Sequence, residues 1–101
     1  MPTARVEFYA TPSCADVLED VQVFVDVLNE REMQERKFGP QNGRTIDFWL
    51  LTIMEELGEC ANEAQQLHHG KPRIAELRAE LVQVAALAVR LIGKIDRDEL
   101  A

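Results

Sequence analysis

The chain has 101 residues, of which 47% are hydrophobic, and this length and composition predict one globular domain rather than several domains or a disordered chain. The formal net charge is −7, so the chain lacks the basic surface that binding to a nucleic-acid backbone requires. No apolar run approaches the roughly 20 residues that span a bilayer, and charged residues interrupt the first stretch, so we expect neither a membrane segment nor a signal peptide.

Residues 1–14 show no helical period, and we expect a short strand or a docked arm there, followed by a single helical domain over residues 15–101. From Ala15 onward, apolar residues recur at spacings of three and four, which predicts an amphipathic helix with Ser13 as its N-cap. This helix is expected to end near Arg36, before a cluster of turn-forming residues. Its apolar stripe consists of Val17, Val21, Phe24, Val25 and Leu28.

A second helix is predicted from Thr45, whose hydroxyl can cap it, to about His68, where Gly70 and Pro72 stop it. A third helix is predicted from about residue 73 to about residue 97. The short connection makes these two helices an antiparallel hairpin, preceded by the first helix, in an all-α fold. The second stripe contains Trp49, Ile53, Leu57, Cys60, Ala61 and Ala64, and the third contains Leu77, Leu81, Val84, Ala85, Ala88, Leu91 and Ile95.

A domain of this size buries only a limited fraction of its own surface. Three wide apolar stripes therefore need a partner, and we expect a homodimer, or a homotetramer, built like a four-helix bundle. The two cysteines, Cys14 and Cys60, fit no paired zinc spacing and indicate reduced thiols, with Cys60 in the core. We expect a soluble, cytoplasmic protein that binds neither nucleic acid nor membranes.

An acidic constellation lies on the second and third helices. At about 100° per residue, Glu56 and Glu59 lie about 60° apart at the edge of the second apolar stripe, whereas Glu55 points nearly opposite to it. Glu80 and Gln83 repeat this arrangement on the third helix. Each pair is about 12 residues, or roughly 18 Å, from the connecting turn, so the hairpin should bring the four side chains together.

Three like charges near a core edge repel one another, and a hard divalent cation removes that repulsion. Carboxylates together with water suit Mg²⁺, with Mn²⁺ as a substitute. The alternative is that acidic helix flanks are simply solvated, which explains most glutamate-rich stretches. The shared facing, the repetition and the register favour a metal site.

The stretch Glu55-Glu56-Leu57-Gly58-Glu59, followed by Glu80-Leu81-Val82-Gln83, resembles the signature of the MazG-like all-α NTP pyrophosphatases, E-E-x-x-E and then E-x-x-D on the next helix. The resemblance extends upstream through residues 30–42 and Trp49-Leu50, and covers about residues 28–95. It implies Mg²⁺-dependent hydrolysis of nucleoside triphosphates to monophosphate and pyrophosphate, in housecleaning of the nucleotide pool. It also implies that Glu56, Glu59 and Glu80 are catalytic metal ligands, with position 83 as the fourth ligand.

The chain departs from that signature at position 83, where Gln83 replaces the aspartate. A glutamine oxygen can ligate a cation but brings no charge, so the metal affinity should fall. Two functions follow: an active enzyme with a weaker metal site, or a relative that binds nucleotides as a sensor without hydrolysing them. The three intact acids favour activity. A structural helical dimerisation module without any ligand is the third alternative.

Basic groups should face the phosphates of a nucleotide. Arg90 and Lys94 continue the stripe of Glu80 and Gln83 towards the C-terminal end and could line the same groove, although cations there also suit the helix dipole. Lys37, before the Gly-Pro turn, is the other candidate.

Four residues are candidates for binding the base. Phe38 and Trp49 could stack on it, while Gln34 and Asn42 could hydrogen-bond to its edge. Trp49 fits the apolar stripe, which favours a core role. Phe38 stands in a polar loop and is the stronger stacking candidate.

Overall fold

The structure, a computed structural model, describes residues 15–69 and 73–101. Its regular elements over these ranges are all helices, as expected: α1 (Ala15–Glu19), α2 (Val21–Phe38), α3 (Ile46–His68) and α4 (Ile74–Asp96). The expected arm over residues 1–14, the N-cap Ser13 and the stop signals Gly70 and Pro72 lie outside the described residues. Within those residues, no helix combines the length and the apolar character of a membrane span.

The first helix was expected to be continuous, but a turn at Asp20 divides it into α1 and α2. The backbone N–H of Asp20 donates to the carbonyl of Val17, three residues back, at 3.2 Å, and this tighter turn interrupts the α-helical pattern. At its other end, α2 continues two residues beyond the expected end at Arg36, to Phe38. Gly39 then adopts a φ of 73°, which favours glycine, and its N–H donates to Glu35 O at 2.9 Å.

The hairpin helices begin and end close to the predicted positions. Thr45 caps α3, because its hydroxyl oxygen accepts a hydrogen bond from the Phe48 N–H at 3.2 Å. Asp47 lies in the first turn of α3, where its charge is favourable against the helix dipole. Arg73 and Arg97 are the flanking residues of α4.

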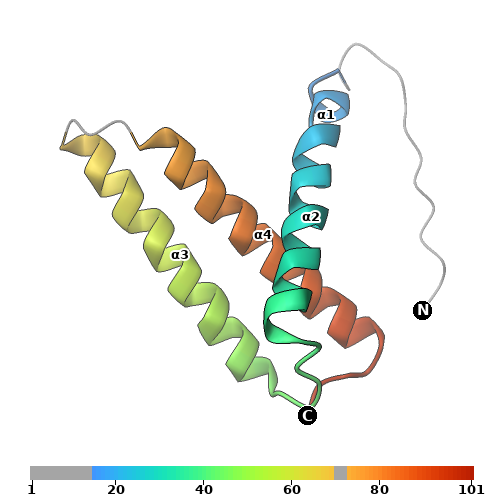
Figure 1. Cartoon of the computed structure of the whole chain (residues 1–101). Helices are drawn as coiled ribbons and strands as arrows, with labels where there is room; N and C mark the ends of the chain where they lie inside the picture. Colours follow the sequence, from blue (N-terminus) through green and yellow to red (C-terminus); the bar gives the residue numbers. More distant parts are fainter. Residues whose placement is uncertain (1–14, 70–72) are drawn as a thin grey trace.

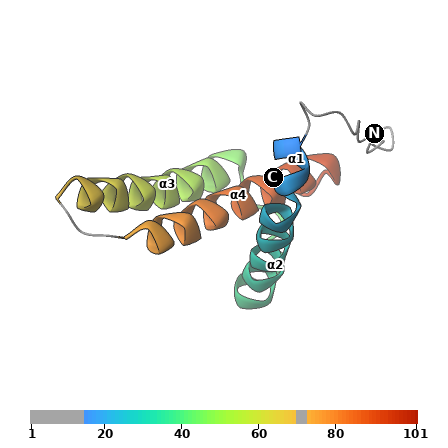
Figure 2. The same ribbon diagram turned by 90° about the horizontal axis from the view of Figure 1, so that it is seen from above.

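The helices α3 and α4 run antiparallel and side by side, and α4 lies between α3 and α2 (Figure 1). Seen from above, α2 crosses one face of the hairpin at a steep angle (Figure 2). A small core of Trp49, Leu87 and Leu91 joins α3 to α4. Leu100 from the segment after α4 packs against this core.

The turn between α2 and α3 is tied to the C-terminal segment by backbone hydrogen bonds. The Gly43 N–H donates to Glu99 O, and the Ala101 N–H donates to Arg44 O, each at 3.0 Å. Gly43 has a φ of 82°, which also favours glycine. The two segments therefore hold one end of α2, α3 and α4 together.

Much of the expected apolar surface is exposed in the described part of the chain. The stripe of α1 and α2 is exposed, with Phe24 62% and Leu28 60% accessible, and the buried residues of α2 are Val27 and Gln34 instead. The expectation that these helices pack against a partner chain stays a prediction.

The hairpin also has an exposed apolar face, which we call the outer face, formed by Leu50, Met54, Leu57, Leu81 and Ile92. At about 100° per residue, Leu81 and Ile92 lie about 160–180° around α4 from Arg90, which contacts the end of α2. These two residues of α4 therefore point away from α2.

Candidate metal and nucleotide site

The acidic residues of the hairpin converge as the sequence register suggested. One carboxylate oxygen from each of Glu56, Glu59 and Glu80 can be chosen so that the three atoms all lie within 4.8 Å of one another. Glu56 and Glu59 come from α3 and Glu80 from α4. The antiparallel hairpin places these positions at one level because they are nearly equidistant from the connection.

The cluster is partly withdrawn from water. Glu56 and Glu80 are half-buried, and one oxygen of each, Oε2, is buried without a hydrogen-bond partner among residues 15–69 and 73–101. Burial, together with the neighbouring Glu59 and Glu56 carboxyl groups, raises the pKa of Glu80 to about 7. Burial and then repulsion from Glu59 raise the pKa of Glu56 as well.

This donor set fits a hard divalent cation. All three groups offer carboxylate oxygens, which Mg²⁺ and Mn²⁺ prefer, and two of the oxygens lack other partners in the described part of the chain. A bound cation would offset the desolvation and repulsion that raise the pKa values of Glu56 and Glu80. Acidic clusters also occur without ions, so these three carboxylates show that the residues are chemically compatible with a divalent cation.

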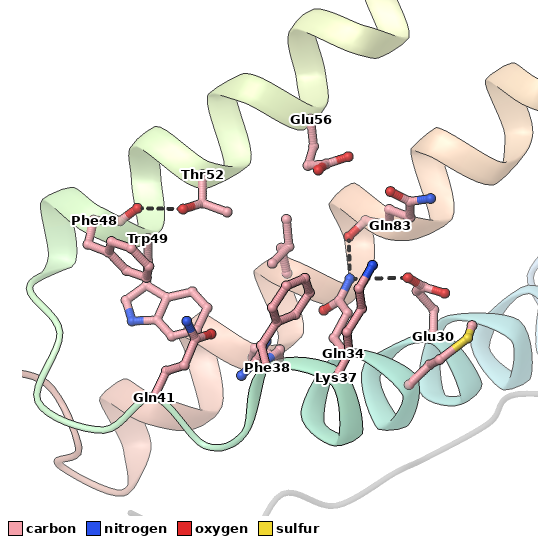
Figure 3. Close-up of a pocket in the computed structure, with 13 residues that line it drawn as sticks. Glu30, Gln34, Lys37, Phe38, Gln41, Phe48, Trp49, Thr52, Glu56 and Gln83 are labelled. Atoms are coloured by element: carbon pink, nitrogen blue, oxygen red, sulfur yellow. Dashed lines mark hydrogen bonds between the residues drawn. The ribbon is translucent and has the colours of Figure 1, made fainter.

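Glu55 and Gln83, the other two residues of the motif, lie in different surroundings. Glu55 is exposed and lies outside the cluster, which agrees with its expected outward facing. Gln83 is half-buried and lines a cavity that also includes Glu56 (Figure 3). Its backbone carbonyl accepts a hydrogen bond from Gln34 Nε2 at 3.3 Å, so α2 is joined to α4 at this position.

A cavity of about 440 Å³ opens between α2, α3 and α4 (Figure 3), within the range of roughly 300–1,000 Å³ typical of small-molecule sites. Glu56 belongs to both the cavity wall and the acidic cluster, so the two features form one continuous site. The residues that line the cavity are Glu30, Met33, Gln34, Lys37, Phe38, Gln41, Phe48, Trp49, Thr52, Glu56, Gln83, Leu87 and Arg90.

Two of the lining residues form an exposed aromatic and cationic pair. Phe38 is 56% exposed at the end of α2, and Lys37 Nζ lies 5.2 Å from the centre of its ring. A planar ligand could therefore reach an aromatic ring and a positive charge on the same side of the cavity.

Trp49, by contrast, is only 1% exposed. Its ring meets Phe48 edge-on at 5.4 Å between centroids, and Arg90 and Lys94 place their cationic groups 4.9 and 5.5 Å from its centre. Trp49 therefore serves the core and forms part of the cavity wall, as the sequence favoured, while Phe38 has the more accessible ring.

Arg90 and Lys94 were expected to line the same groove as Glu80 and Gln83. Arg90 lines the cavity that Gln83 also lines, whereas Lys94 is not among its lining residues. Both cations are buried, at 2% and 3% exposure. Arg90 Nη2 donates to Gly39 O at 3.0 Å, and Lys94 Nζ donates to Asn42 Oδ1 at 2.9 Å. The helical face is the one predicted, but the turn between α2 and α3 folds over it. Both cations therefore fasten that turn to α4, and the side-chain oxygen of Asn42 is engaged by Lys94.

Arg90 has a second partner in Glu35, whose carboxylate lies 3.4 Å from its guanidinium. Burial lowers the pKa of Arg90, and the carboxylate of Glu35 opposes that effect. Glu35 also pairs with Arg31 at 2.8 Å, so the two guanidinium groups share one carboxylate.

Sequence reasoning did not single out Glu30, although its carboxylate Oε1 accepts from Gln34 Nε2 at 3.5 Å and it lines the cavity. The four-residue spacing of Glu30 and Gln34 on α2 was the available signal, since such positions are neighbours on a helix. Met33, Gln41 and Thr52 were also missed as lining residues. Their inclusion depends on how α2 crosses the hairpin, which no local pattern reports.

Comparisons of the chain with protein-family models, with curated proteins and with solved structures gave no significant match.

Proposed function

We propose that this protein hydrolyses nucleoside triphosphates to the monophosphate and pyrophosphate with Mg²⁺. The observation that carries the proposal is the continuity between the three-glutamate cluster and a cavity of nucleotide-compatible size, joined at Glu56. The resemblance of the motif residues to the MazG-like pyrophosphatases supports the same activity.

Each end of the site suits one part of a nucleotide. Mg²⁺ held by Glu56, Glu59 and Glu80 would neutralise the phosphate oxygens and activate water for attack on the α-phosphorus. Lys37 offers an exposed charge for the phosphate chain, and Phe38 offers a ring face for the base. The buried Arg90 keeps the turn beside this cavity closed onto α4.

The test is a product-resolved assay with common nucleoside triphosphates and Mg²⁺ or Mn²⁺. We expect pyrophosphate as the first product, and Glu59→Gln should abolish its release because one of three carboxylates is lost. Glu55→Gln, an exposed neighbour on α3, is the matched control and should retain activity. Orthophosphate as the first product would contradict the proposal.

A second candidate function is nucleotide sensing without turnover. The feature that favours it is Gln83, which lines the cavity where the family signature has an aspartate, so that the site has three carboxyl groups rather than four. Binding without turnover in either metal, with turnover restored by Gln83→Asp, would favour this function.

We also propose that the protein self-associates through its outer face. The supporting observation is that Leu50, Met54 and Leu57 of α3 are 48–64% exposed on the same helix that carries the acidic cluster. A second hairpin packed there would complete a four-helix arrangement and remove this apolar surface from water.

A further inference from the structure

Gln34 is a buried amide in the wall of the cavity. It is 7% exposed, and it projects from α2 between Glu30 on its own helix and Gln83 on α4 (Figure 3). Its Nε2 donates to the backbone carbonyl of Gln83 at 3.3 Å and to the carboxylate of Glu30 at 3.5 Å.

These two partners determine the orientation of the amide. The backbone carbonyl of Gln83 and the carboxylate of Glu30 both accept hydrogen bonds, so the NH₂ group of Gln34 has to face them. The opposite orientation would place an oxygen against two acceptors. The amide oxygen is therefore fixed on the other side, which is the side of Phe38 in Figure 3.

That oxygen, Oε1, is buried and has no hydrogen-bond partner in the described part of the chain. An unpaired buried acceptor is costly, and such groups in native proteins generally have a partner from the protein, water or a ligand. A partner for Oε1 has to supply an N–H or O–H donor. Phe38 lines the same cavity and is more than half exposed at the end of α2, so a base stacked on its ring would lie on the side of Oε1.

We infer that Gln34 makes this site selective for nucleobases that carry an amino group at C4 of a pyrimidine or at C6 of a purine. The inference rests on the proposed function for the identity of the ligand as a nucleotide. Cytosine and adenine offer an N–H donor at the position where uracil and hypoxanthine carry a carbonyl oxygen. A carbonyl set against Gln34 Oε1 would leave two acceptors unpaired and in repulsion.

The test compares pairs of nucleotides that differ only in this group. Isothermal titration calorimetry in Mg²⁺ would measure the Kd of the cytidine and uridine triphosphates that carry a methylene bridge between the α and β phosphorus atoms, which blocks hydrolysis there. We expect the cytidine analogue to bind about 10–100-fold more tightly. The same preference is expected in kcat/KM for CTP over UTP and for ATP over ITP.

Gln34→Met removes both the donor and the acceptor while keeping the length of the side chain, and it should bring the cytidine-to-uridine ratio close to one. Gln22→Met is the matched control, because Gln22 lies on the exposed start of α2 and hydrogen-bonds Asp26. It should retain the wild-type ratio. A preference that persists in Gln34→Met would overturn the assignment to this residue.

The outcomes separate this inference from the proposed function. Pyrophosphate release with equal constants for amino and carbonyl bases would overturn the inference and leave the hydrolytic activity standing. A preference in binding without any turnover would support the inference and contradict the hydrolysis. If circular dichroism shows that Gln34→Met is unfolded, the wild-type protein alone still tests the inference. A ratio near one between its Kd values for the uridine and cytidine analogues would overturn it.

Discussion

In the acidic cluster, burial and the two neighbouring carboxyl groups strongly raise the pKa of Glu80. Its pKa is raised from 4.5 to about 7, so the folded protein retains a proton there that the unfolded chain releases. The stabilising contribution is therefore present below about pH 4.5 and is lost as the pH rises to about 7. Metal binding, which competes with that proton, should strengthen over the same range.

We predict that the free energy of unfolding of the metal-free protein falls between about pH 4.5 and pH 7, and that Glu80→Gln reduces this fall. Urea denaturation at a series of pH values would measure it. Glu76→Gln, an exposed position on the same helix, is the control and should keep the wild-type slope. The same slope in Glu80→Gln and wild type would contradict the raised pKa.

Arg90 is the second residue whose burial has a measurable consequence. We predict that Arg90→Met lowers the free energy of unfolding by about 1–3 kcal/mol, because Gly39 O loses its buried donor. Chemical denaturation would test this. Glu35 keeps its contact with Arg31, so the loss should come mainly from the turn.

The matched control for that substitution is Arg36→Met, since the Arg36 side chain is 77% exposed and its partner Glu32 is also exposed. Its effect should stay within about 0.5 kcal/mol. Equal effects of the two substitutions would show that Arg90 does not stabilise the turn.

At the scale of the elements, the start of α3 depends on a single cap. Thr45→Ala removes the acceptor for the Phe48 N–H and should lower the free energy of unfolding by about 1 kcal/mol. Thr45→Ser retains the hydroxyl and should remain close to wild type. Thermal or urea denaturation would distinguish them, and equal losses in both variants would rule out the cap as the cause.

The limits of α3 and α4 were predictable because their signals are local. The Thr45 hydroxyl predicted the start of α3, and the apolar periodicity predicted both ends of α4. Each predicted limit lies within one residue of the observed one. The interruption at Asp20 has no comparable signal, since its flanking residues continue the apolar period. Local patterns thus predicted the hairpin but not the division of the preceding helix.

The acidic cluster was also predictable, since the hairpin register follows from helix geometry and the position of the turn. The burial of Arg90 and Lys94 could not be predicted from the sequence. It depends on the position of the turn after α2, which is held by contacts with residues near the C-terminal end of the described chain, such as Glu99. The orientation of Gln34 likewise depends on a partner 49 positions away in the sequence.

At the scale of the whole molecule, the outer face is the surface through which we propose self-association. We predict that the wild-type protein sediments as a dimer or tetramer at micromolar concentration, and that Leu57→Glu combined with Leu81→Glu shifts it towards the monomer. Both positions are about half exposed, so the substitutions place charge in the interface without removing much core packing.

Gln22→Glu adds negative charge on exposed α2 and serves as the control, because it should leave the oligomer intact. A wild-type monomer in sedimentation velocity would contradict the self-association. Loss of helical content in the double variant would instead show that the two leucines stabilise the hairpin itself.

The cationic surroundings of Trp49 have a practical consequence. The protein contains one tryptophan, and it lies in the cavity wall beneath the turn that Arg90 and Lys94 secure. Its fluorescence is therefore an intrinsic, label-free probe of two events, the detachment of that turn and the arrival of a ligand. The emission should move to longer wavelength when water reaches the indole, while a nucleotide entering the cavity should change its intensity with the ring still buried.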